Sequence, residues 1–160
     1  MLNTPKQITM ENWKLLLKKM KLDNIKEKAP NFFIASGGYE MKVKPYRDDS
    51  ANHLTNTIID FITFPGGDAN RINTQGQLRK IKGEMKWTHG STRRGTADIH
   101  AIFQGRHISI EIKIGNDRQS EAQIKEAERV RSAGGLYFVA KNMDSFLKWW
   151  EETFQLTIIK

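Results

Sequence analysis

A two-residue connection between two alternating apolar stretches is the feature that most constrains how this chain folds. Residues 96–103 (TADIHAIF) and 106–114 (RHISIEIKI) each alternate apolar and polar side chains, and Gln104-Gly105 joins them. A connection of this length that contains glycine suits the positive backbone angles of a tight hairpin turn. The sequence therefore predicts an antiparallel hairpin over 96–114.

The register of this hairpin brings charged side chains together. Pairing Phe103 with Arg106 across the turn places Asp98 directly opposite Glu111, and directly opposed residues share one face of a sheet. Alternation adds Lys113 to that face. The opposite face, which is predicted to enter the core, carries Ile108, Ile110, Ile112 and Ile114.

Asp98, Glu111 and Lys113 admit two interpretations. Opposed carboxylates repel each other, so the needs of the fold alone would not select them, whereas a divalent cation bound between them would reverse the sign of that interaction. A lysine beside the cation would stabilise negative charge on a reacting phosphate. The alternative is a solvated strand face, on which Lys113 neutralises one acid as an ordinary surface ion pair.

The N-terminal half of the chain predicts two helices and a connection. Apolar residues recur at helical spacing over 9–28, and Pro30 is expected to end that helix. Residues 31–50 contain a Gly-Gly break and a further proline, which favours an irregular or short extended connection. Residues 48–50 then offer side-chain caps for a helix over 53–64.

From Pro65 onward the pattern alternates between strands and helices. This order predicts an α/β fold in which helices flank a central mixed β-sheet. The predicted elements are a short strand in 68–76, two extended arms joined at Gly83, the 96–114 hairpin, a helix between Ser120 and Gly134, a strand over 136–140 and a final helix over 144–154.

Composition narrows the class of function. The formal net charge is +8, and residues 71–95 hold seven Lys or Arg residues against the single acid Glu84. Clustered basic side chains gain free energy by releasing counterions from phosphates, so a polyanionic partner is expected. The absence of cysteine excludes thiolate zinc sites and cysteine nucleophiles, so any metal would be held by oxygen or imidazole.

Neither membrane insertion nor secretion is indicated. No apolar run reaches the length of a membrane helix, and the N-terminus lacks a basic-then-apolar signal pattern, so a cytoplasmic protein with no membrane partner is expected. A chain of 160 residues is the size of a single globular unit.

The motifs GTAD at 95–98, EIK at 111–113 and SEAQ at 120–123, in this order of elements, resemble the PD-(D/E)XK nuclease superfamily, and in particular its VRR-NUC branch. The resemblance implies a restriction-endonuclease-like core of order α-β-β-β-α-β. It implies a VRR-NUC-like nuclease domain over 46–160, with 1–45 as an N-terminal helical extension packed on the core.

The resemblance also implies roles for individual residues. Asp98 and Glu111 would bind Mg²⁺ (or Mn²⁺) together with the backbone carbonyl of Ile112, and Lys113 would serve catalysis. The family places a glutamine beside the active site at the position of Gln123. The same residue completes a capping box at the start of its helix, and the two roles are compatible.

Five residues are candidates for binding DNA. Arg71 and Asn73 resemble a strand of VRR-NUC proteins that can face substrate phosphates, with a solvated strand edge as the alternative. Lys86 belongs to the basic segment, and Arg93 and Arg94 lie in a glycine-containing loop that leads directly to Asp98.

The expected activity is that of a magnesium-dependent DNA endonuclease, acting on branched DNA such as junctions or flaps, or on duplex DNA. A homodimer is the expected assembly. Many relatives offer a glutamate from the first core helix, where this chain has Asn52 and Asn56, which leaves a second metal in doubt. The alternatives are a catalytically silent DNA-binding module and an RNA-processing domain. Trp149-Trp150 is assigned to core packing or a dimer contact.

Overall fold

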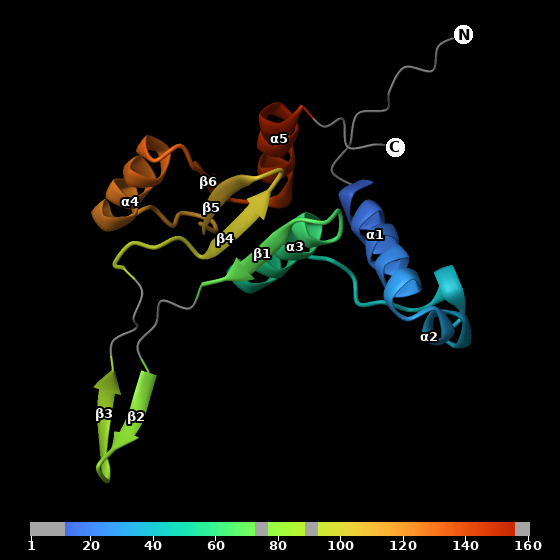
Figure 1. Cartoon of the computed structure of the whole chain (residues 1–160), viewed down its shortest axis with the longest axis horizontal. Coiled ribbons are helices and arrows are strands. Elements are labelled where there is room, and N and C mark those ends of the chain that lie inside the picture. The colour runs from blue at the N-terminus through green and yellow to red at the C-terminus, as the bar shows by residue number, and fades with distance from the viewer. Residues whose placement is uncertain (1–11, 73–76, 89–92, 156–160) are drawn as a thin grey trace.

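The computed structural model describes residues 12–72, 77–88 and 93–155 (Figure 1). Its helices are α1 (Asn12–Lys28), α2 (Pro30–Ala35), the short 3₁₀ helix η1 (Gly38–Glu40), α3 (Ala51–Thr63), α4 (Glu121–Ser132) and α5 (Met143–Phe154). Its strands are β1 (Asp68–Arg71), β2 (Gln77–Ile81), β3 (Glu84–Thr88), β4 (Ile99–Phe103), β5 (Arg106–Ile112) and β6 (Leu136–Ala140).

A mixed four-stranded sheet organises the fold. Its strand order is β1-β4-β5-β6, in which β4 pairs antiparallel with both β1 and β5, whereas β6 runs parallel to β5. Strands β2 and β3 form a separate two-stranded sheet. The predicted α/β class and the mixed sheet flanked by helices are therefore confirmed, while the assignment to a nuclease core stays a prediction.

The β4–β5 hairpin has the predicted register. Phe103 pairs with Arg106 across the turn, and Ile99 pairs with Ile110 farther along. Both turn residues have positive φ, 49° at Gln104 and 73° at Gly105, as a tight two-residue hairpin turn requires.

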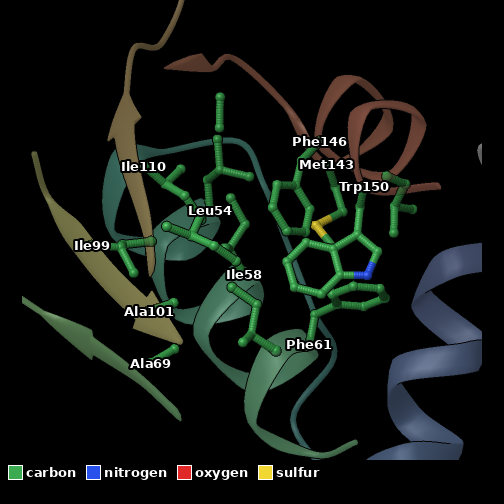
Figure 2. Close-up of a cluster of buried hydrophobic side chains, with 14 of the residues drawn as sticks. Leu54, Ile58, Phe61, Ala69, Ile99, Ala101, Ile110, Met143, Phe146 and Trp150 are labelled. Carbon is green, nitrogen blue, oxygen red and sulfur yellow. The ribbon is translucent and has the colours of Figure 1, made fainter. Parts of the chain in front are cut away.

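One face of the sheet packs on α3 and α5 to form the main core (Figure 2). Ile108 and Ile110 of β5 are fully buried there, against side chains such as Leu54 and Phe146. Trp150 is also buried, and Trp149 stacks on Phe138, which confirms the core-packing assignment of the tryptophan pair. The other face carries a smaller cluster with α4, which consists of Ala97, Ala127, Val130 and Tyr137.

The predicted caps and breaks hold for the core helices. The Ser50 hydroxyl accepts a hydrogen bond from the His53 amide at the start of α3, and α3 ends before Pro65. The predicted N-terminal helix is present as α1, whose Trp13 and Leu17 join the main core. No described helix has both the length and the apolar character needed to cross a membrane.

The segment 31–50 differs from the prediction, because α2 and η1 lie in the stretch expected to be irregular or extended. Pro30 ends α1 but also begins α2, since proline at the first helical position lacks only an N–H that would have no partner there. Burial of Phe33 holds this short helix, and its edge-to-face contact with Tyr39 joins it to η1.

Gly95 packs tightly against the first turn of α4. Its φ is +86°, and a Cβ at this position would lie 2.3 Å from the Ala122 carbonyl oxygen and 2.9 Å from the Gln123 nitrogen. The loop that leads to β4 therefore approaches α4 as closely as it does because residue 95 has no side chain.

We expect Gly95→Ala to destabilise the fold by more than the cost of the backbone conformation alone. Gly66→Ala is the matched control. Gly66 has a similar φ of +94°, but a Cβ at this position would have no described atom within 4 Å. A positive φ costs about 1 kcal/mol in a non-glycine residue, and the clash should add 1 kcal/mol or more to this in Gly95→Ala, on the order of a core overpacking. Urea unfolding of both variants measures the difference, and equal losses would contradict the close approach.

Candidate active site

Asp98 lies immediately before β4, where two hydrogen bonds join three segments of the chain. Its backbone carbonyl accepts from the Ile72 amide at 2.8 Å, and its carboxylate Oδ2 accepts from the Ile112 amide at 2.9 Å. Because Ile99 pairs with Ile110, the register places Asp98 beside Glu111 at the end of the sheet. The predicted juxtaposition of these two acids is thus confirmed, whereas their roles stay predictions.

Glu111 is a buried carboxylate with only one of its oxygens hydrogen-bonded. The residue is 2 % exposed, in spite of its position on the face opposite the main core. Its Oε1 lies 3.2 Å from Lys113 Nζ and also accepts a hydrogen bond from Gln123 Nε2. Its Oε2 is buried and has no hydrogen-bond partner among the described residues. A buried acceptor without a partner is costly, so the solvated strand face that was the alternative for Glu111 does not describe this residue.

The surroundings of Glu111 favour its protonated form. Burial, and then the charge of Asp98, raise the pKa of Glu111 to about 7, although Lys113 acts in the opposite direction. A carboxyl group with this pKa binds and releases protons near neutral pH.

Lys113 lies between two carboxylates. It is 8 % exposed, and its Nζ is 3.2 Å from Glu111 Oε1 and 3.5 Å from Asp117 Oδ2. Burial alone would lower the pKa of Lys113, but Glu111 and Asp117 outweigh burial and the net shift is upward. The side chain is therefore an ammonium group at neutral pH and can act as a fixed positive charge.

Gln123 completes the predicted capping box and also contacts Glu111, while its role in catalysis stays a prediction. Its Oε1 accepts from the Ser120 amide at 2.8 Å, and the Ser120 hydroxyl accepts from the Gln123 amide at 3.4 Å, which completes the capping box of α4. The Nε2 of the same side chain donates to Glu111. One residue thus links the start of α4 to the buried carboxylate.

Arg71 extends the site along the end of the sheet. It is exposed at the end of β1, pairs in register with Ile99, and donates from Nη1 to Asn52 Oδ1 at 2.8 Å. Asn52 is therefore engaged by a basic side chain. Asn56 lies elsewhere, in a surface pocket that Lys44 also lines.

The other DNA-binding candidates are only partly brought to the site. Arg93 is exposed, with Nη1 3.9 Å from the buried Oε2 of Glu126 on α4, and Arg94 is exposed beside it. Lys86 lies on β3 in the separate hairpin and pairs with Glu84 at 3.3 Å. Asn73 lies outside the described residues.

Two acidic residues near the site, Asp117 and Glu126, were not predicted from the sequence. Asp117 follows Lys113 by four residues in a turn, and no local pattern marks it. Glu126 follows Gln123 by three residues, and this spacing predicts only that both lie on one face of α4. Arg129 binds Glu126, and that contact is the largest cause that lowers the pKa of Glu126.

The carboxylates of Asp98 and Glu111 fit a hard cation such as Mg²⁺ that keeps most of its bound water. Over the described ranges, no three His, Asp or Glu side chains gather into a potential metal-binding group. Mg²⁺ is commonly bound through only one or two carboxylates, with water completing its coordination. The unpartnered Oε2 of Glu111, beside Asp98, is the observation that fits such an ion.

The raised pKa of Glu111 predicts a pH-dependent stability in the metal-free protein. The folded state binds this proton more tightly than the unfolded chain, so stability should fall as pH rises from 4.5 to about 7. Glu111→Gln removes the charge and should be more stable than the parent chain at pH above 7, by up to about 3 kcal/mol. Urea unfolding with a chelator at acidic and alkaline pH measures this, with the exposed Glu152→Gln as control. A constant difference across pH would refute the prediction.

Comparison with known proteins adds no assignment to this geometry: no protein family matches the chain, and no curated protein sequence matches it.

Proposed function

We propose that the chain is a metal-dependent phosphodiesterase that hydrolyses DNA. The observation that carries this proposal is the buried Glu111, whose free Oε2 lies in a site that also holds Asp98 and the ammonium group of Lys113. Removing such charges from water and leaving an oxygen unpartnered destabilises a fold, and strongly shifted carboxyl groups of this kind concentrate at functional sites.

The two carboxylate oxygens of Glu111 have different surroundings. Lys113 and Gln123 both bind Oε1, which fixes the rotamer of the side chain and leaves Oε2 free for a ligand. The Ile112 amide likewise holds Oδ2 of Asp98. Both carboxylates are therefore positioned by other groups before any ligand binds, and such preorganisation lowers the cost of binding and of reaction.

Mg²⁺ or Mn²⁺ would be held by Asp98, Glu111 and the Ile112 carbonyl, and it would supply positive charge beside a phosphate and make water more acidic. Lys113 contributes a second positive charge that orients water or stabilises the negative charge developing on the phosphate. Asp117 keeps that ammonium group in place from the side opposite Glu111. Gln123 positions Glu111 rather than touching the reacting atoms.

DNA is the substrate that the charge distribution favours. Arg71 is exposed at the end of the sheet that carries Asp98, and Arg93 and Arg94 are exposed on the adjoining loop. The resemblance to VRR-NUC nucleases supports the same substrate, with branched DNA or duplex as the target. Cytoplasmic action and a homodimer belong to the same proposal.

The two rival functions explain less of the site. A silent DNA-binding module has no need of a buried, ionisable Glu111 beside Lys113, although the pairing of Asn52 with Arg71 is compatible with one. An RNA-binding domain commonly stacks bases on exposed aromatic rings, whereas Trp149 and Trp150 pack into the core of the described structure.

Metal binding gives a test that is independent of catalysis. We expect Mg²⁺ to raise the melting temperature of the parent chain in a concentration-dependent way, because a ligand that binds only the folded state stabilises it. Glu111→Gln should abolish the shift, and Glu152→Gln should retain it. A shift that survives in Glu111→Gln would exclude this carboxylate as a ligand.

Cleavage tests the proposed reaction itself. Linear, flapped and four-way-junction DNA are incubated with Mg²⁺, with Mn²⁺ or with a chelator. Lys113→Met keeps much of the side-chain volume but removes the charge, and it should lower the rate about a hundredfold or more. Cleavage at the parent rate in Lys113→Met or Glu111→Gln would contradict the mechanism.

A further inference from the structure

The hairpin of β2 and β3 stands apart from the rest of the fold. It forms its own sheet, and Figure 1 shows it projecting from the end of the four-stranded sheet. An isolated two-stranded hairpin is marginally stable in water at best. Its persistence as a separate element therefore calls for a partner surface.

The insert that carries this hairpin is closed at its base beside the candidate active site. The chain leaves β1 after Arg71 and returns to β4 through Asp98, and the Ile72 amide donates to the Asp98 carbonyl at 2.8 Å. Both ends of the insert thus meet beside Asp98, which is a proposed metal ligand. A ligand bound along the hairpin would be tethered next to that site.

The hairpin is strongly basic. Arg79 is the register partner of Lys86, so two basic residues occupy one paired position of the two strands. Within residues 77–88, four basic residues stand against the single acid Glu84. The phosphates of a polyanion would neutralise this excess of positive charge and release counterions.

The hairpin also exposes apolar side chains among the basic ones. Met85 is 59 % exposed and pairs in register with Lys80, and Ile81 at the turn is 39 % exposed. Apolar side chains read the thymine methyl group, and basic side chains read guanine or bind phosphate, in the major groove of DNA.

We propose that β2–β3 is a ribbon that enters the major groove of duplex DNA and holds the duplex against the candidate active site. This inference rests on DNA as the substrate of the proposed function, but not on its hydrolysis. Strands of five residues span about 17 Å at 3.4 Å per residue. The major groove of B-form DNA, about 12 Å wide, admits a two-stranded ribbon of this kind.

Lys86→Glu tests the ribbon by a change of charge at one exposed position. The substitution also removes the ion pair of Lys86 with Glu84. Amide hydrogen exchange over residues 77–88 of the variant therefore checks that the hairpin is retained. Lys148→Glu, at an exposed position on α5, changes the net charge equally and serves as the matched control.

The full-length chain is titrated, with a chelator present, against a DNA duplex of about two helical turns and an RNA duplex of the same sequence, by fluorescence anisotropy. The major groove of A-form RNA is too deep and narrow for side chains to read. We expect Lys86→Glu to weaken DNA binding on the order of fivefold relative to Lys148→Glu, as for one lost phosphate contact. The two variants should bind RNA equally.

Equal losses on DNA and RNA would overturn insertion into the groove and leave only general charge attraction. No loss on DNA would remove the hairpin from the interface, and a parent chain that does not bind duplex DNA would overturn both proposals. Intact, hairpin-dependent binding without metal-dependent cleavage would instead refute hydrolysis alone. The failure of each proposal is thus distinguishable.

Discussion

The pairing of β4 with β5 is the interaction on which both the core and the candidate site depend. One face of this hairpin buries its isoleucines against α3 and α5, while the same register sets Asp98 beside Glu111 on the other face. A shift of the register by one residue would exchange the two faces and bury the acids in the apolar core. The energy of core packing thus indirectly holds the site together, because it makes any other register unfavourable.

The same arrangement sets stability against the proposed function. Glu111 is taken out of water, beside Asp98, with one oxygen unpartnered, and only Lys113 and Gln123 compensate for this. The stabilising free energy that offsets the burial of Glu111 comes from the large apolar cluster on the opposite face of the sheet. Residues that do most to stabilise the fold and residues proposed to react therefore alternate along one strand.

The sequence predicted those features that local patterns determine. The Gln104-Gly105 turn, the capping box at Ser120 and the strand over 136–140 each depend on a few adjacent residues, and all three are present. The short helix α2 was missed, since it depends on burial of Phe33 by residues beyond its own segment. Contacts between elements, such as Gln123 with Glu111 and Arg93 with Glu126, could not be predicted, because they depend on where α4 packs. Family membership stays a prediction, since no comparison supports it.

The hydrogen bond between Ile72 and Asp98 has a consequence for how such a chain can change over evolution. It closes the insert that carries β2 and β3 at its base, so the insert is a loop with fixed ends. The entropic cost of a longer or shorter loop grows only slowly with its length. Residues could therefore be added, removed or exchanged in the insert without disturbing Asp98 or the sheet. Selection can then alter which substrates are held while the groups proposed to react keep their geometry.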